Sequence, residues 1–417
     1  MTVADFGEFG LISAVRGILP PDPPGMLGPG DDGAVLPAPD GRVVATTDLL
    51  IEGRHFRRDW SSAADIGTKA AAQNLADIAA MGATPTALLF GLAIPGEVAA
   101  AWVLDATRGM AAECARAGAV IAGGDVTSAD EIMLAITALG DLAGLAPVTR
   151  AGARPGDLIA LNAPTGRSAA GLALLQAGLT GDLDSPAESR PAPGTAGGRP
   201  GGTAPPADLT AESRPAPGRA GGRTAGTAPA ADLTAESRPA PGPAERRPAG
   251  TSPTADLTAE SQPGPTAADP GRSPLTPSLA AELAGLVAAH RRPQPDYAAG
   301  PAAAAAGATA MIDISDGLVA DLGHIADSSG ACLSVISASL PGIAVLKAAA
   351  GWLDADWRLW ALGGGEDHAL AATFPSRQKV PQGWTVIGDV RAGAGVLVDS
   401  RPFEGPAGWD HFRRGRD

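Results

Sequence analysis

Residues 65–81, DIGTKAAAQNLADIAAM, decide how the surrounding chain is organised. The alanine-rich run predicts a helix, and Asp65 is suited to be its N-cap. One residue fits this helix poorly: Asp77 stands amid alanines near its middle, three residues after Asn74 on the same face. Aspartate has a low helix propensity in a helix interior. The stretch therefore predicts a helix in which Asp77 has a functional role.

Strands and helices alternate on both sides of this helix, as apolar runs and Gly/Pro punctuation indicate. Just before it, RVVATT at 42–47 is a predicted strand that delivers Asp48 at its end. The rhythm recurs in the second half of the chain, which predicts an α/β (α+β) protein of two domains. The other predicted strands are 86–94, 131–139, one ending at Asp313, 332–336 and a closing run of strands from 368 to 399, and apolar runs occur at 119–125 and 156–161; the other predicted helices are 97–117, 167–178, 278–289 and 316–327.

A repeat interrupts this alternation: ADLTAESRPAPG occurs at 207–218 and returns at 231–242. Between Asp182 and Arg272 the only large apolar side chains are leucines, too few to offset the entropy lost on ordering. We therefore expect 182–275 to be a disordered insertion rather than a stack of repeats. The predicted domains are 1–147 and, on either side of the insertion, 148–181 with 276–417.

The charge, the cysteine content and the apolar runs of the sequence exclude several classes of protein. The 417 residues carry a formal net charge of -14, which disfavours a nucleic-acid surface, since phosphate backbones are held by clusters of Lys and Arg. Two cysteines, Cys114 and Cys332, lie far apart in the sequence, as is usual in a reducing compartment. The N-terminus shows no secretory pattern, and no apolar run approaches the roughly 20 residues that span a bilayer. We expect a cytoplasmic protein that binds neither nucleic acid nor membrane.

Aspartates recur between glycines and at the ends of apolar runs, where an α/β fold presents functional groups. Each aspartate alone is most simply interpreted as a turn or cap residue. Their number in the same kind of position argues instead for a shared function. Clustered carboxylates repel one another unless cations neutralise them, and oxygen ligands select hard divalent ions. We therefore predict several Mg2+ ions that bridge phosphates. The aspartates are Asp31 and Asp32 in GPGDDG, Asp48 in TTD, Asp77 in NLAD, Asp125 in AGGD, and Asp313 and Asp316 in IDISDGL.

The P-loop motif is absent from the sequence, and the one match to the dinucleotide-binding motif GxGxxG lacks the strand and helix that should flank it. No GxxxxGK[ST] loop leads to any of the three lysines, Lys69, Lys347 and Lys379. GPGDDG supplies the glycines of GxGxxG, but it is preceded by PPDPPGML and followed by AVLPAPDG, so it neither follows a strand nor opens a helix. These observations predict a metal-rich nucleotide site without a P-loop.

A series of motifs resembles the thiamine-monophosphate kinase family, within the aminoimidazole-ribonucleotide-synthetase-like superfamily. In chain order they are GEFGLI, GPGDDGAVL, TTDLLIEGRHF, KAAAQNLADIAAMGATP, GGDVTSA, VTRAGARPGD, IDISDGLVADLGHI, LGGGEDHAL and GWDHF. The resemblance implies ATP- and Mg2+-dependent phosphorylation of thiamine monophosphate to thiamine diphosphate, the last step of thiamine diphosphate biosynthesis. It also implies a homodimer, with a mixed-sheet N-terminal domain that binds ATP and Mg2+ and dimerises, beside a C-terminal α/β domain.

The same resemblance implies roles for individual residues. Metal ligands would be Asp32, Thr46, Thr47, Asp48, Asp77, Asp125, Asp313 and Asp316; nucleotide contacts would be Gly124, Asp125, Arg150 and Ser315; substrate contacts would be His55, Glu366 and Trp409. Catalysis would rest on Asp32, Asp48, Asp77, Asp125 and Arg150. Three positions depart from the commoner family pattern: Thr46 stands for a serine, His368 for a tyrosine, and Trp409 for another aromatic residue.

The expected chemistry follows from the acceptor. A phosphate monoester has a second pKa of about 6, so its oxygen is already an anion at neutral pH and needs no general base. Positioning and charge neutralisation should dominate a direct in-line transfer, with Arg150 forking onto phosphate oxygens. Trp409 could stack on the thiamine ring. Two alternatives stay open on the sequence: a sister ATP-dependent synthetase or ligase of the superfamily, and a non-catalytic nucleotide or thiamine-phosphate sensor.

Overall fold

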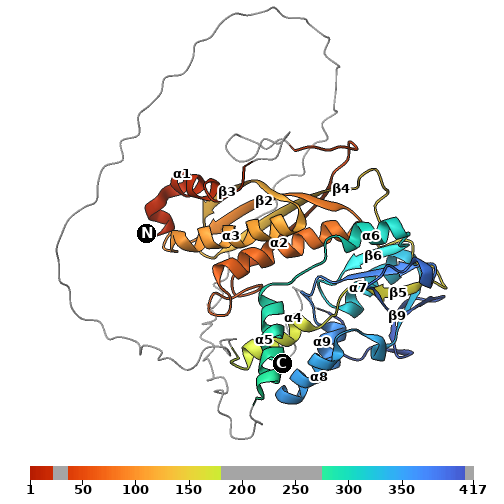
Figure 1. Ribbon diagram of the computed structural model, residues 1–417. Coiled ribbons are helices and arrows are strands. Elements are labelled where there is room, and N and C mark those ends of the chain that lie inside the picture. The colour runs from red at the N-terminus through yellow and green to blue at the C-terminus, as the bar shows by residue number, and fades with distance from the viewer. Residues whose placement is uncertain (22–35, 180–274, 409–417) are drawn as a thin grey trace, which may run out of the picture. The chain divides into compact units, whose positions relative to one another are not determined.

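A computed structural model of the chain describes residues 1–21, 36–179 and 275–408 (Figure 1). These ranges belong to one compact unit, which comprises Met1–Pro186 and Gln262–Asp417. Several sequence predictions lie outside the described residues: the ligand Asp32 with its neighbour Asp31, the substrate contact Trp409, and the insertion at 182–275 except for its last residue. The predicted domain boundaries stay a prediction.

The first sheet has four strands in the order β1–β4–β2–β3. Its β2–β3 pair is parallel and the other two pairs are antiparallel. Burial alternates along β1 and β4, because α2 packs along one face of these strands while the other face is open. The elements are α1 (Val3–Arg16), β1 (Val44–Ile51), α2 (Ala63–Ala80), β2 (Thr84–Ile94), α3 (Ala100–Ala117), β3 (Val120–Ser128) and β4 (Met133–Asp141).

Helix α2 begins at a different cap from the one the sequence suggested. Ser62 is the N-cap: its Oγ accepts a hydrogen bond from the Asp65 N–H at 3.2 Å, and Asp65 Oδ2 accepts one from the Ser62 N–H at 3.1 Å. Asp65 is therefore the reciprocal partner of a capping box and not the cap itself. Further along, α2 lies close to α3, since a Cβ on Gly67 would lie 1.8 Å from the Ala106 carbonyl oxygen.

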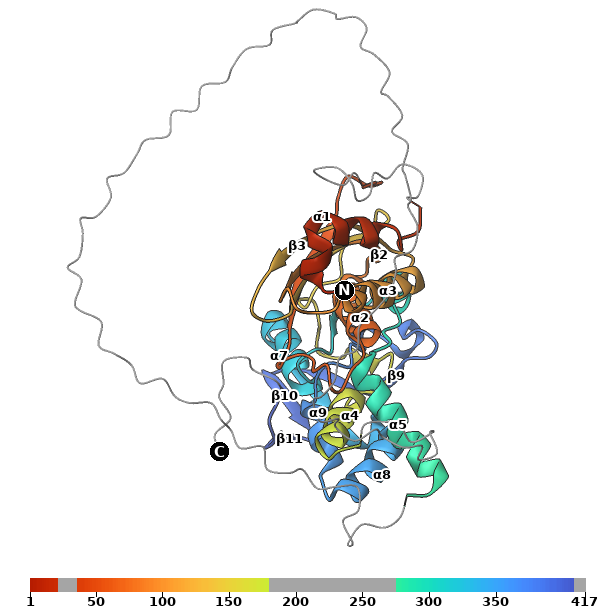
Figure 2. The same cartoon turned by 90° about the vertical axis from the view of Figure 1, so that its left-hand side faces the viewer.

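The second sheet has seven strands in the order β11–β10–β7–β9–β5–β8–β6. Only its β10–β7 pair is parallel. Helices α4 and α5 pack against each other beside this sheet (Figure 2). The elements are β5 (Leu158–Leu161), α4 (Arg167–Gln176), α5 (Pro277–Arg291), α6 (Ala299–Ala306), β6 (Ala310–Asp313), α7 (Leu318–Ser329), β7 (Cys332–Val335), α8 (Ile343–Leu353), α9 (Trp357–Gly363), β8 (Leu370–Phe374), β9 (Thr385–Arg391), β10 (Gly395–Val398) and β11 (Arg401–Pro402).

The mixed α/β prediction is confirmed, and one strand differs in a way that matters for the site. Asp48 lies inside β1 and not at its end, because the apolar alternation continues and Leu50 is fully buried. Four helices of the structure were not predicted from the sequence: α1, α6, α8 and α9. Within the described part of the chain, every helix is too short or too polar to cross a membrane.

Candidate phosphoryl-transfer site

Three polar side chains of α2, Lys69, Gln73 and Asp77, follow the capping-box residue Asp65 at intervals of four residues. Residues at this spacing lie one above another on a helix, and we call them the polar stripe of α2. At 1.5 Å per residue, its two ends are roughly 12 Å apart along the axis. The two ends have different electrostatic surroundings.

At the acidic end, Asp77 lies near Asp48 of β1 and Asp313, the last residue of β6. Burial, together with the charges of Asp313 and Asp48, raises the pKa of Asp77 to about 8. The hydroxyl of Thr46 donates a hydrogen bond to Asp77 Oδ2 at 2.9 Å and partly opposes this shift. Four predicted metal ligands are therefore neighbours, and their negative charge is incompletely compensated.

Amide side chains of α2 orient Asp48. Its backbone N–H donates to Asn74 Oδ1 at 2.9 Å, and Gln73 Nε2 donates to its Oδ2 at 3.1 Å. Asn74 is fully buried, and its own Nδ2 donates to the Ala70 carbonyl at 3.0 Å. The helix thus fixes both the backbone and the carboxylate of a residue on the neighbouring strand.

His368 lies against the second-sheet side of the acidic end. Its Nδ1 is 3.2 Å from Asp313 Oδ2, and both side chains are buried. Burial alone would lower the pKa of His368, but the hydrogen bond and charge of Asp313, with the charge of Asp77, outweigh it and the pKa is raised. When this imidazole is protonated, it offsets part of the acidic charge.

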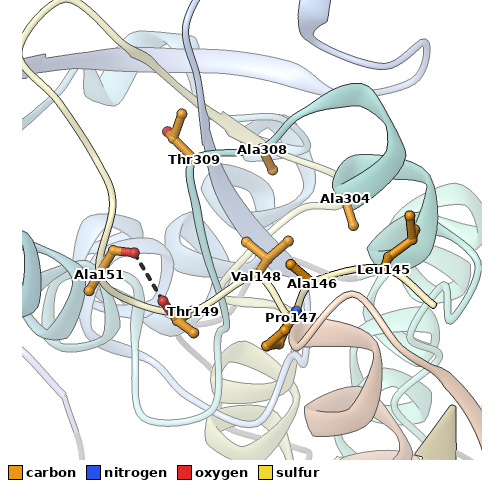
Figure 3. Close-up of a pocket in the computed structure, with 9 residues that line it drawn as sticks. All are labelled: Leu145, Ala146, Pro147, Val148, Thr149, Ala151, Ala304, Ala308 and Thr309. Atoms are coloured by element: carbon orange, nitrogen blue, oxygen red, sulfur yellow. Dashed lines mark hydrogen bonds between the residues drawn. The ribbon is translucent and has the colours of Figure 1, made fainter. Parts of the chain in front are cut away.

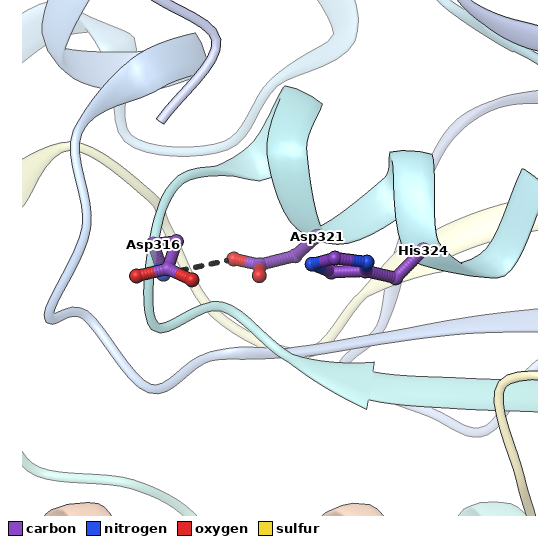
Figure 4. A group of neighbouring side chains, drawn as sticks. All are labelled: Asp316, Asp321 and His324. Carbon is purple, nitrogen blue, oxygen red and sulfur yellow. Dashed lines mark hydrogen bonds between the residues drawn. The ribbon is translucent and has the colours of Figure 1, made fainter. Parts of the chain in front are cut away.

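The loop between β6 and α7 is organised by Asp321, a residue that the sequence analysis did not single out. Asp321 Oδ2 accepts hydrogen bonds from the backbone N–H groups of Ser315, Asp316 and Gly317 at 3.0–3.1 Å. Burial and the charge of Asp313 raise the pKa of Asp321 to about 7. Figure 4 shows its carboxylate between Asp316 and His324, with ligand atoms of all three within 4.8 Å of one another.

The acidic end fits a hard divalent cation. Its donors are carboxylate oxygens and the Thr46 hydroxyl, the oxygen ligands that Mg2+ prefers. A bound dication would also remove the repulsion that holds the pKa of Asp77 so far above the ordinary aspartate value. Thr46, Asp48, Asp77 and Asp313 are the predicted ligands at this end, whereas the described carboxylate and imidazole atoms that all lie within 4.8 Å of one another are those of Asp316, Asp321 and His324.

Backbone hydrogen bonds join the GGGEDH motif (363–368) to the IDISDG motif (312–317). The Glu366 N–H donates to the Ser315 carbonyl at 2.8 Å, and the His368 N–H donates to the Ile314 carbonyl at 2.9 Å. A Cβ on Gly365 would lie 2.2 Å from the Ser315 oxygen, so only glycine permits this approach. Glu366 and His368 both have positive φ, of 64° and 53°, which is unusual for residues other than glycine.

At its other end the polar stripe is charge-balanced. Lys69 is only 3% exposed, and its Nζ lies 2.8 Å from Glu366 Oε1 and donates to the His55 carbonyl at 2.8 Å. His290 Nδ1 is 3.5 Å from Glu366 Oε2 and 3.0 Å from Ser168 Oγ. Burial, followed by the charge of Lys69, lowers the pKa of His290 to about 4, so its ring is neutral at pH 7. The contact with Glu366 is therefore polar rather than ionic.

Two predicted substrate contacts, His55 and Glu366, meet at this balanced end. Besides its carbonyl contact with Lys69, His55 accepts a hydrogen bond at Nδ1 from the Ile51 N–H, at 3.0 Å. Because a backbone N–H can only donate, the neutral ring of His55 carries its proton on Nε2. The third predicted substrate contact, Trp409, lies outside the described residues.

Asp125 does not join the acidic end within one chain. It lies on β3, the edge strand opposite β1, and pairing runs from it through Gly91 and Ala135 to Leu49. Residues paired across a sheet share a face, so Asp125 points to the open face and Asp48 to the face under α2. Three strand spacings of about 4.8 Å also separate the two edge strands.

Thr47 and Gly124 likewise lie apart from the acidic end. Thr47 faces away from Thr46, as strand neighbours do, and its hydroxyl donates to the Ile136 carbonyl at 2.8 Å. Gly124 sits on the edge strand, where a Cβ would lie 2.1 Å from the Phe90 oxygen. Their roles as ligand and nucleotide contact stay predictions.

Arg150, the predicted phosphate-binding arginine, is exposed. Its carbonyl accepts a hydrogen bond from Ser329 Oγ, at the far end of α7 from Asp316. Its neighbours Thr149 and Ala151 line a pocket of about 260 Å³ that reaches Thr309 (Figure 3). The pocket is lined by Leu145, Ala146, Pro147, Val148, Thr149, Ala151, Ala304, Ala308 and Thr309. It contains no ionisable side chain and lies near the start of β6, whereas Asp313 ends that strand.

The structure also brings to the site residues that were not predicted for it: Lys69, Gln73, Asn74, His290, Asp321 and His368. The spacing of Lys69, Gln73 and Asp77 by four was a readable signal once the helix was predicted. Asp321 gave no such signal, because an acidic residue in the first turn of a helix is common for electrostatic reasons alone.

Comparison with known proteins identifies the family. Residues 30–142 match the model of "AIR synthase related protein, N-terminal domain". Thiamine-monophosphate kinase from Mycobacterium tuberculosis is 37% identical over 414 residues, covering 99% of this chain and 93% of the relative. The Corynebacterium glutamicum enzyme of the same name is 33% identical, with coverage of 99% and 95%.

Solved structures agree with these relatives. The thiamine-monophosphate kinase of Stenotrophomonas maltophilia superposes with a TM-score of 0.62 at 27% identity, covering 96% of this chain and 98% of that one. AaThiL complexed with AMPPCP and TMP superposes with a TM-score of 0.61 at 25% identity, covering 99% of both chains. The family resemblance noted in the sequence is confirmed, and this chain belongs to the thiamine-monophosphate kinase family.

Proposed function

We propose that this protein transfers the terminal phosphoryl group of ATP to thiamine monophosphate, giving ADP and thiamine diphosphate. The main support for this function is the structural match, over 99% of both chains, to AaThiL complexed with AMPPCP and TMP. The described chain supports the same chemistry, because it gathers carboxylates at one end of α2 and two predicted acceptor contacts at the other.

The residues of this chain suggest how the transfer proceeds. The acceptor phosphate is already anionic at neutral pH, since its second pKa is about 6, and an oxygen of it forms the new bond to phosphorus as the bond to the ADP oxygen breaks. His55 and Glu366 bind and orient the acceptor, and Arg150 donates to phosphate oxygens as a fixed cation. No side chain is phosphorylated in this route.

We propose Mg2+ as the cation of the acidic end, held by Thr46, Asp48, Asp77 and Asp313, with Asp32, Thr47, Asp125 and Asp316 as the further predicted ligands. When bound, Mg2+ supplies neutralisation of the phosphate charges that otherwise repel each other. The incompletely compensated carboxylates around Asp77 support this assignment.

We also propose a homodimer, which the placement of Asp125 supports. Asp125, Thr47 and Leu49 share the open face of the first sheet, where Leu49 is 49% exposed. A second copy seated on this face could bring the Asp125 of one copy to the β1 edge of the other. Sedimentation of the wild type as a dimer and of Leu49→Asp as a monomer is the expected result; a monomeric wild type refutes the proposal.

A cytoplasmic location is the accompanying proposal, since Cys114 and Cys332 are both buried free thiols and ATP is the phosphoryl donor. The activity itself is tested by incubating the protein with ATP, Mg2+ and thiamine monophosphate and separating the products by chromatography. Stoichiometric ADP and thiamine diphosphate are expected. Turnover only with another acceptor would identify a sister enzyme, and bound ATP without turnover would identify a sensor.

A further inference from the structure

Lys69 is a buried cation to which neither the family resemblance nor the proposed reaction assigns a role. It is only 3% exposed, whereas Lys347 and Lys379 are exposed. A buried ammonium is costly unless it is paired and hydrogen-bonded. Lys69 meets both needs through the Glu366 carboxylate and the His55 carbonyl, each at 2.8 Å.

These two partners come from different parts of the chain. His55 follows β1 of the first sheet, and Glu366 lies in the loop between α9 and β8 of the second. Nζ of Lys69 contacts both, and α2 holds it by packing along β1 and against α3. The position of each partner is thus tied to the same rigid helix.

The pairing also fixes the charge and rotamer of Glu366. Burial alone would raise the pKa of Glu366, but the charge of Lys69, with the contact to His290, holds it lowered, so the group is a carboxylate at pH 7. One carboxylate oxygen faces Lys69 and the other faces His290. With positive φ at residue 366 and its N–H on Ser315, backbone and side chain are both held.

We propose that Lys69 is a positioning residue for the phosphoryl acceptor: it holds Glu366 and the His55 segment in the geometry that binds thiamine monophosphate. This rests on the proposed function, which makes His55 and Glu366 acceptor contacts. Lys69 acts through Glu366 and His55 and does not touch the acceptor. Its loss should therefore weaken acceptor binding while leaving the nucleotide and the metal ligands unaffected.

The test compares steady-state kinetics of the wild type, Lys69→Met, Glu366→Gln and the double variant. Lys379→Met is the matched control, because it makes the same substitution at an exposed lysine. Methionine keeps the length of the Lys69 stem and removes its charge. We expect Lys69→Met to raise KM for thiamine monophosphate about tenfold, the scale of one charged hydrogen bond, with kcat and the KM for ATP within about threefold.

The double variant separates positioning from other roles. If Lys69 acts through Glu366, adding Lys69→Met to Glu366→Gln should raise the acceptor KM less than about threefold further, since coupled residues are not additive. The double variant should also melt at a higher temperature than Lys69→Met, because no carboxylate is left without its partner.

Each outcome decides the question. Full additivity of the two substitutions means that Lys69 contacts the acceptor itself and overturns the proposal, as does an unchanged acceptor KM in folded Lys69→Met. Equal loss in kcat and in both KM values means a general structural role and also overturns it. A wild type that makes no thiamine diphosphate overturns the proposed function first and this inference with it, so the two failures are distinguishable.

Discussion

The two ends of the polar stripe of α2 differ in charge: carboxylates repel one another at one end, and opposite charges are paired at the other. At one end, Asp77 lies near two other carboxylates, and burial with their charges raises its pKa to about 8. At the other end, roughly 12 Å away along the helix, Lys69 and Glu366 are paired at 2.8 Å beside a neutral His290. The carboxylates of the first end repel one another, whereas the charges of the second end are paired within the chain itself.

The difference indicates which end changes when substrates bind. Like charges held together by the fold favour ligands that neutralise them, so the acidic end is suited to Mg2+, which would in turn attract the anionic phosphates of a nucleotide. A balanced, hydrogen-bonded network is already ordered and costs little further reorganisation, which suits the binding of an acceptor in one fixed orientation. One helix therefore joins a group of mutually repelling carboxylates to a network whose charges are already paired.

Asp77→Asn is the substitution that should break the acidic end most severely. We expect kcat to fall about a thousandfold, because a metal ligand that stabilises transferring phosphate charge is lost. The folded protein without metal should be at least as stable as the wild type, since one of several repelling carboxylates is removed. Kinetic assays and thermal melts in EDTA check both halves; a variant that is inactive only because it is unfolded contradicts the assignment.

His290→Gln tests the balanced end through pH. The pKa of His290 is lowered from 6.5 to about 4 in the folded protein, so the unfolded chain binds the proton more tightly. The stability contributed by neutral His290 is present above pH 6.5 and is lost as pH falls toward 4, a change of roughly 3 kcal/mol. Glutamine cannot titrate, so urea unfolding of the variant should lose less stability than the wild type across this window. Parallel pH curves for the two proteins would count against a neutral His290.

Magnesium should distinguish the two ends in a single experiment. At 100 times its Kd, a ligand of the folded state adds about 2.7 kcal/mol to the free energy of unfolding. We expect Mg2+ to raise the melting temperature of the wild type and of Lys69→Met alike, because Lys69 lies at the balanced end. In Asp77→Asn the increase should be much smaller. An equal increase in all three proteins would place the cation elsewhere.

Thr46 provides the smallest and sharpest test. Its hydroxyl donates to Asp77 at 2.9 Å, so Thr46→Val, which keeps the shape and removes the donor, should lower kcat/KM for ATP about tenfold, or roughly 1.4 kcal/mol. Thr46→Ser keeps the hydroxyl and should stay within about threefold of the wild type. If serine and valine behave alike, the hydroxyl has no role at the acidic end.

The sequence predicted the elements around the site better than the contacts between them. The helix at 65–81 lies within two residues of the observed α2, because its composition is strongly helical over its whole length. Helix α6, AGPAAAAA, was missed because a nearly uniform alanine run has no apolar period to read. The N-cap was misplaced because Asp65 and Ser62 are both good caps and only the geometry decides between them.

The aspartates were found because they recur in one kind of sequence context, and the structure makes Asp48, Asp77 and Asp313 neighbours. Lys69 could not be assigned from the sequence, since its partner Glu366 lies far along the chain and only the fold brings them to 2.8 Å. For the same reason, strand order was needed to find that Asp125 lies on the opposite edge and face of the sheet from Asp48.

The polar stripe also makes the site sensitive to chain length. Inserting or deleting one residue between Lys69 and Asp77 would turn one end by about 100° relative to the other and shift it by about 1.5 Å. Lys69 would then face away from Glu366, or Asp77 away from Asp48 and Asp313. A substitution at one of these nine positions changes the contacts of one side chain, whereas a change in their number would separate the balanced end from the acidic end at once.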